Sequence, residues 1–150
     1  MHDHKPFSLA DFQRANGNKK LSEMDYVQAV YATTPLHFDF LISYARLFSP
    51  EIKVVDGRAF ILELFDSERH QELMAVTQDA DHAQYWMNLL EITGLFDELT
   101  TEQATELAKI IAACWNRTLL AEHESSCGEA RYIADPDSGE VFITITKQSL

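Results

Sequence analysis

One segment near the middle of the chain constrains its fold more than any other. Residues 51–65, "EIKVVDGRAFILELF", are two β-rich runs joined by Asp56–Gly57. An Asp–Gly pair between two such runs is typical of a short hairpin turn, because both positions tolerate positive φ. The second run is apolar on both alternating faces, which indicates an inner strand rather than an edge strand. We therefore expect an antiparallel hairpin over residues 51–65.

A second hairpin is predicted over residues 131–147, within "ARYIADPDSGEVFITITK". Pro136 fits the second position of a tight turn, and Gly139 can supply the positive φ that closes it. The strand after the turn alternates Val141, Ile143 and Ile145 with Phe142, Thr144 and Thr146. The simplest arrangement joins both hairpins in one antiparallel sheet, with helices packed against it.

Helix signals surround the two hairpins. Capping-box spacings occur at Ser8–Asp11, Ser22–Asp25, Asp81–Gln84 and Thr100–Gln103, and the helix that begins near Asp81 should end at Gly94. Thr34–Pro35 should open another helix, which Pro50 ends, and residues 67–77 form a weaker one. The predicted class is α+β: about six helices on a sheet built from hairpins 51–65 and 131–147, in a single domain, residues 1–150. The expected core contains Leu41, Tyr44, Phe60, Leu62, Leu89, Leu107, Ile111, Cys114, Trp115 and Ile143.

Charge is the one unusual feature of the composition. The chain has 24 acidic and 12 basic side chains, a net charge of −12. Residues 1–50 are balanced, so residues 51–150 carry all of the excess. Such a surface repels nucleic acid and anionic membranes and attracts basic proteins, although it can also serve solubility alone. We therefore expect no nucleic acid and no membrane among the partners.

Several classes of site have no counterpart in the sequence. Phosphate-binding and dinucleotide-binding glycine loops, the Ser elbow of hydrolases and the H-E-x-x-H zinc motif are all missing from it. Two cysteines suit a reducing compartment, and no apolar segment of secretory type begins the sequence. We expect a cytoplasmic protein that uses no cofactor.

The segment "QDADHAQYWMN", residues 78–88, has two interpretations. Aspartates before a helix accept bonds from its free N–H groups, so Asp79 and Asp81 with His82 can simply begin a helix. Alternatively, Asp79 and His82 meet His70 or Asp66 across the fold and bind a metal ion. We favour the helix start and expect no metal. The alternative function is a small metal-dependent enzyme that uses Asp79, His82 and His70.

Other potential ligands favour structural roles. Cys114 lies on the apolar face of the longest predicted helix, so we expect it to be buried. Cys127 lies in the polar segment "EHESSCGEA" and should be exposed, but its acidic neighbours oppose a thiolate nucleophile. His2 and His4 of "MHDH" could hold copper or nickel weakly, and we interpret them as a tail.

A set of acidic residues carries the functional hypothesis. Glu98, Glu102 and Glu106 are spaced by four, so they should line one side of the start of the long helix. This acidic ridge can oppose Lys and Arg of a partner and accelerate encounter, or it is only the solvated back of an amphipathic helix. We expect a non-catalytic acidic binding module, of inhibitor, chaperone or adaptor type, for a basic protein partner. A homo-oligomer is also compatible with the sequence.

Overall fold

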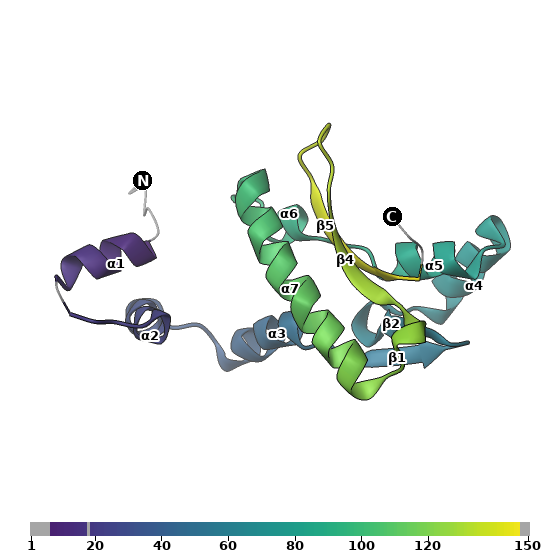
Figure 1. Ribbon diagram of the computed structural model, residues 1–150, viewed down its shortest axis with the longest axis horizontal. Coiled ribbons are helices and arrows are strands. Elements are labelled where there is room, and N and C mark those ends of the chain that lie inside the picture. The colour runs from purple at the N-terminus through teal and green to yellow at the C-terminus, as the bar shows by residue number, and fades with distance from the viewer. Residues whose placement is uncertain (1–6, 18, 148–150) are drawn as a thin grey trace. The chain divides into compact units, whose positions relative to one another are not determined.

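The computed structural model describes residues 7–17 and 19–147. The chain divides into two compact units, residues 1–43 and 44–150, which we describe separately (Figure 1). The described residues contain seven α-helices and two antiparallel sheets, which confirms the predicted α+β class. No helix in this described part is long and apolar enough to cross a bilayer.

The first unit holds α1 (Leu9–Ala15), α2 (Glu23–Thr33) and the beginning of α3 (Phe38–Phe48). Both predicted capping boxes are confirmed, since Ser8 and Ser22 exchange side-chain and backbone bonds with the aspartates three residues later. The rings of Phe7 and Tyr26 contact the buried Phe12, with centroids 6.4 and 5.8 Å from it. The buried ring of Phe12 therefore packs α1 against α2.

Helix α3 begins three residues later than Thr34–Pro35 predicts, at Phe38. The ring nitrogen Nδ1 of His37 accepts a hydrogen bond of 3.0 Å from the backbone N–H of Asp39. A side-chain acceptor at this position satisfies one of the free N–H groups of the first turn. His37, rather than the proline, therefore marks the beginning of α3.

Both predicted hairpins are present in the second unit. Strands β1 (Ile52–Val55) and β2 (Arg58–Ile61) are joined by Asp56 and Gly57, which both have positive φ, 51° and 75°. Strand β2 ends earlier than predicted, at Ile61, and the 3₁₀ turn η1 (Leu62–Leu64) leads to α4 (Ser67–Thr77). The second hairpin consists of β4 (Glu129–Ala134) and β5 (Val141–Thr146), with φ of 76° at Gly139 in its turn.

The two hairpins lie in separate sheets rather than in the single sheet that the sequence predicts. Strands β1 and β2 form one sheet, and the other has the order β3-β5-β4. The extra strand arises because the helix predicted to end at Gly94 is divided into α5 (Ala80–Met87), the short strand β3 (Leu90–Glu91) and α6 (Ile92–Leu95). Helix α7 (Thr101–Glu122), with its predicted Thr100 capping box, and the 3₁₀ turn η2 (Ser125–Cys127) follow.

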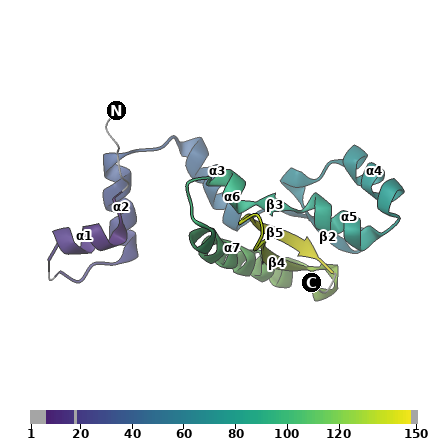
Figure 2. The same ribbon diagram turned by 90° about the horizontal axis from the view of Figure 1, so that it is seen from above.

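Helix α7 covers one face of the three-stranded sheet, alongside β4 and β5 (Figure 2). Ile111 and Trp115 of α7 and Ile143 of β5 belong to one core cluster and are at most 1% exposed. The indole Nε1 of Trp115 donates to the carbonyl of Leu47, 2.8 Å away, which holds the end of α3 against this core. The prediction was correct for these three residues and for Phe60. It was wrong for Leu41, Tyr44 and Leu62, which are 38–44% exposed, whereas Leu89, Leu107 and Cys114 are half-buried.

Two fully buried amides, Gln84 of α5 and the C-cap residue Asn88, join the two sheets. Asn88 accepts a bond from the N–H of Ile61 in β2 (2.9 Å) and donates to the carbonyl of Ile145 in β5 (3.2 Å). One turn earlier, Gln84 donates to the carbonyl of Ala59 in β2 (3.1 Å) and accepts from the N–H of Lys147 (3.1 Å). Side-chain amides therefore replace the main-chain ladder that would have made one continuous sheet.

Candidate protein-binding site

The structure confirms that residues 78–88 contain a helix start. The carboxylate of Asp79 accepts bonds from the N–H groups of Asp81 (3.0 Å) and His82 (3.4 Å), so Asp79 is the N-cap of α5. The predicted box of Asp81 with Gln84 does not form. Asp81 instead pairs with the guanidinium of Arg58 at 2.9 Å, and Gln84 lies in the amide junction.

The residues of the alternative metal site have separate environments. The ring of His82 stacks on Trp86, with centroids 6.0 Å apart, whereas the ring of His70 packs against Phe60 and Phe65 at 5.3 and 5.4 Å. Asp79 caps a helix. Across residues 7–17 and 19–147, no three His, Cys, Asp or Glu side chains form a cluster that could hold a metal ion. His2 and His4 lie outside the described residues.

The expected environments of the two cysteines were wrong. Cys127 is buried, 8% exposed, within the main core cluster, while Cys114 is only half-buried. The carbonyl of Cys127 accepts a 2.8 Å hydrogen bond from Nε2 of the buried Gln84. This bond fixes the polar segment against the core, so its polar composition is a poor guide to the position of the thiol.

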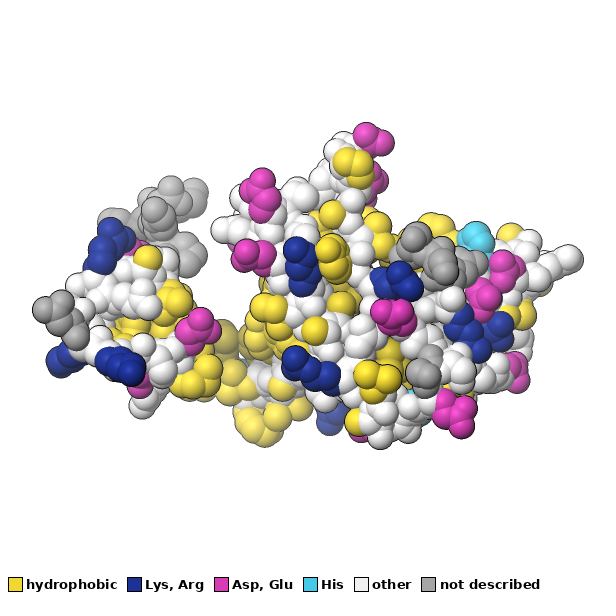
Figure 3. All heavy atoms as spheres, viewed as in Figure 1, with side chains coloured by type: hydrophobic (Ala, Val, Ile, Leu, Met, Phe, Trp, Pro, Cys, Tyr) yellow, Lys and Arg dark blue, Asp and Glu magenta, His cyan; other side chains and the backbone are white. Residues whose placement is uncertain are grey.

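All three residues of the acidic ridge are exposed. Glu98 precedes the N-cap Thr100, so the helical spacing holds only for Glu102 and Glu106. Within the described chain, no hydrogen bond or salt bridge engages the carboxylate of any of the three. Figure 3 shows acidic side chains at the amino-terminal end of α7 and a basic side chain further along the helix. The ridge is therefore available to an external cation.

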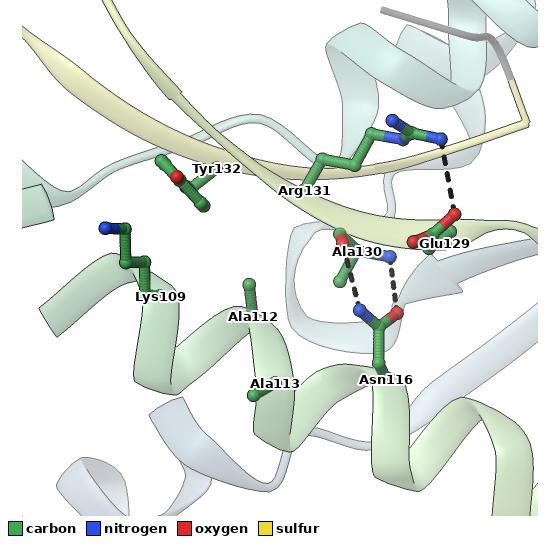
Figure 4. Close-up of a pocket in the computed structure, with 8 residues that line it drawn as sticks. All are labelled: Lys109, Ala112, Ala113, Asn116, Glu129, Ala130, Arg131 and Tyr132. Atoms are coloured by element: carbon green, nitrogen blue, oxygen red, sulfur yellow. Dashed lines mark hydrogen bonds and ion pairs between the residues drawn. The ribbon is translucent and has the colours of Figure 1, made fainter. Parts of the chain in front are cut away.

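A groove lies between α7 and β4, on the same helix. It has a volume of about 490 Å³ and is shown in Figure 4. Its lining residues are Lys109, Ala112, Ala113, Asn116, Glu129, Ala130, Arg131 and Tyr132. A second hollow of about 400 Å³ shares Asn116 and Glu129 with it and extends toward Leu120. The two hollows therefore follow the outer side of β4.

The groove has a polar wall, an apolar floor and one aromatic ring. The amide of Asn116 bonds both backbone groups of Ala130, accepting from its N–H (2.7 Å) and donating to its carbonyl (3.0 Å). The Lys109 ammonium lies 5.6 Å from the centroid of the Tyr132 ring, which is 42% exposed. Arg131 and its partner Glu129, 3.2 Å apart, belong to the other face of β4, and in Figure 4 the Arg131 side chain points away from α7.

Helical periodicity places part of the ridge beside the groove. Residues 102, 106, 109, 113 and 116 recur every three or four positions of α7, so they share one face of the helix. Glu102 and Glu106 thus continue the line of Lys109, Ala113 and Asn116 toward the helix start. From the start of α7 onward, this exposed face therefore presents first two carboxylates, then the apolar floor of the groove and the backbone of β4.

The groove was not predicted from the sequence. One signal was present: the pair Ala112–Ala113 and the polar Asn116 interrupt the large apolar side chains of α7. Small residues on a helix leave room between it and a neighbouring strand, but they do not identify that strand. The lining combines the amide of Asn116, three alanines and the Tyr132 ring with the charged side chains of Lys109, Glu129 and Arg131.

No family model matches this chain, and no curated protein or solved structure matches it significantly.

Proposed function

We propose that the protein is a non-catalytic, cytoplasmic binding module for a basic protein partner, of inhibitor, chaperone or adaptor type. The observation that carries the proposal is the exposed acidic ridge, Glu98, Glu102 and Glu106, whose described carboxylates have no internal partner. Glu102 and Glu106 share the helix face that borders the α7–β4 groove. An unpaired acidic ridge beside an open groove offers a partner both electrostatic attraction and contact area.

The charge distribution supports a basic partner. Residues 51–150 carry 19 acidic and seven basic side chains, so a positively charged protein approaches an attractive field. Each ridge carboxylate that meets a Lys or Arg at an exposed rim contributes about 0.5 kcal/mol. Three such contacts amount to roughly 1.5 kcal/mol, which is about a tenfold change in affinity.

The experiment uses a fluorescent, end-blocked octapeptide of alternating lysine and valine, with anisotropy as the readout. The full chain should bind it, and affinity should fall as salt rises. Replacing Glu98, Glu102 and Glu106 with glutamine should weaken binding about tenfold.

The matched control removes the same charge elsewhere. Glu63→Gln, Glu68→Gln and Glu72→Gln alter three exposed glutamates on η1 and α4, so they change net charge equally. This control should lose less than about threefold in affinity. Equal losses in the two triple variants, or binding that does not respond to salt, would refute the proposal. An octapeptide of glutamate and valine that binds equally well would also refute it.

A further inference from the structure

The outer edge of β4 is an unpaired strand edge. Strand β4 pairs only with β5 among the described residues, in the register Tyr132↔Ile143 and Ala134↔Val141. The N–H of Asp135 bonds the carbonyl of Glu140 across the hairpin, at 2.9 Å. Because hydrogen bonding alternates along an antiparallel pair, the backbone groups of Ile133 and Arg131 face β5 as well. Those of Ala130, Tyr132 and Ala134 therefore point outward.

Asn116 independently confirms this orientation. Its amide bonds the N–H and the carbonyl of Ala130, as a residue of a neighbouring strand would. Among the described residues, it closes the edge at one position only. In this part of the chain, no partner bonds the outward N–H and carbonyl of Tyr132 or those of Ala134, toward the hairpin turn.

We propose that an extended segment of the basic partner adds to β4 as a further antiparallel or parallel strand, pairing with Tyr132 and Ala134 within the α7–β4 groove. This inference rests on the proposed function and deepens it. Strand addition of this kind obtains affinity from main-chain bonds and specificity from pockets for alternate side chains.

The groove fits such a segment. Side chains of an added strand alternate between the two faces, so every second one faces α7. There Ala112 and Ala113 leave a hollow of about 490 Å³, bounded by the Tyr132 ring and Asn116, which can receive an aliphatic side chain. Lys or Arg of the same segment can reach Glu106 or Glu102 along the helix face.

Charge distinguishes the basic segment from a second copy of this chain. Edge-to-edge pairing of two copies would bring together two bodies that each carry the whole excess of negative charge, which opposes association. A segment that contains Lys or Arg removes this repulsion and meets unpaired carboxylates. The occupant is therefore a basic, extended segment of another protein.

The test measures amide protection in the full-length protein. Hydrogen exchange followed by NMR, with and without saturating lysine–valine octapeptide, should show at least tenfold slower exchange at Tyr132 and Ala134. Arg131 and Ile133 serve as internal controls, because β5 already protects their amides. An octapeptide with N-methyl groups at alternate residues keeps its charge but loses donors, and it should bind at least tenfold more weakly.

Protein variants provide a second measurement. Ala134→Pro removes one outward N–H, which an edge strand tolerates, and it should weaken octapeptide binding at least fivefold. Ala134→Val keeps that N–H and should bind within twofold of the original chain. If Ala134→Pro fails to fold, the hydrogen-exchange measurement on the unaltered protein still tests the proposal, because slower exchange at Tyr132 and Ala134 must appear there.

The outcomes separate the two proposals. Binding that depends on the acidic ridge without new protection at Tyr132 and Ala134 overturns strand addition and leaves the proposed function standing. Absence of octapeptide binding overturns both. Protection of these amides that rises with protein concentration alone, together with dimers in analytical ultracentrifugation, assigns the edge to a second copy and overturns the basic-segment proposal.

Discussion

Asn88→Ala provides the sharpest test of how the two sheets are joined. The Asn88 side chain is fully buried and makes three hydrogen bonds: with the N–H of Ile61 and with the carbonyls of Ala59 and Ile145. Truncation leaves the Ala59 carbonyl with its bond from Gln84, but the Ile61 N–H and the Ile145 carbonyl lose theirs. Each unsatisfied buried group costs about 1–3 kcal/mol. We therefore expect Asn88→Ala to lower the free energy of unfolding by about 4 kcal/mol.

Urea denaturation followed by circular dichroism measures this loss, and Gln71→Ala is the control. Gln71 is an exposed amide of α4, so its removal should change the free energy of unfolding by less than about 0.5 kcal/mol. Hydrogen exchange at the Ile61 amide gives a local readout. In Asn88→Ala, the N–H of Ile61 should exchange at least tenfold faster than the amides of β5 in the same variant. A loss for Asn88→Ala no larger than that for Gln71→Ala would refute the role of the amide junction.

Three further predictions follow from individual contacts. In single-cysteine variants, a bulky thiol reagent should modify Cys127 at least about tenfold more slowly than Cys114, because Cys127 belongs to the core cluster. Equal rates of modification would contradict the burial of Cys127. The backbone N–H and hydroxyl of Ser22 hold the pKa of the Asp25 carboxyl below its ordinary value. The capping box should therefore stabilise α2 fully at a pH above the pKa of this carboxyl in the unfolded chain. This stabilisation should be lost as pH falls through the lower pKa of the folded protein. Carboxyl ¹³C shifts should report that titration, and Asp25→Asn should abolish the associated change in helicity. Asp79→Ala should cost about 1 kcal/mol through loss of the N-cap, and His82→Ala less than about 0.5 kcal/mol. A chelator that lowers the melting temperature of the unaltered protein would instead favour a metal role.

Local signals predicted the elements that local contacts stabilise. The capping boxes at Ser8, Ser22 and Thr100 use residues three positions apart, so their spacing in the sequence contains the whole interaction. The same holds for the turns at Asp56–Gly57 and Gly139, where positive φ selects the residue type. These features could be identified without knowing where the rest of the chain lies.

The sheet arrangement could not be predicted in this way, because distant amides determine it. The Gln84 bond to Cys127 spans 43 residues, and the Asn88 bond to Ile145 spans 57. Nothing in the spacing of residues 84 and 88 identifies the strands that their amides contact. Interpreting Gln84 as part of a capping box was reasonable locally and wrong, since its buried donors contact backbone carbonyls across the fold.

The candidate site was predicted only in part, for a related reason. Exposure of Glu102 and Glu106 follows from the amphipathic pattern of α7, and Glu98, which precedes this helix, is exposed as well. Periodicity shows which residues share a face, but it does not show which element covers that face. Leu41 and Leu62 were placed in the core for this reason, and the position of Tyr132 opposite Lys109 could not be anticipated.

The two outward sides of the β4–β5 hairpin are bonded differently, and this contrast bears on function. Along β5, the hydroxyl of Thr93 accepts from the N–H of Val141, β3 pairs with Ile143, and the amides of Asn88 and Gln84 bond Ile145 and Lys147. Along β4, Asn116 is the one described residue that bonds the outward backbone, at Ala130. Open strand edges promote unwanted association, so a fold selected only for stability and solubility would be expected to close both sides of the hairpin. The outward backbone of Tyr132 and Ala134 has no partner in the described part of the chain and lies beside the exposed Glu102 and Glu106, which supports the proposal that this edge binds a partner.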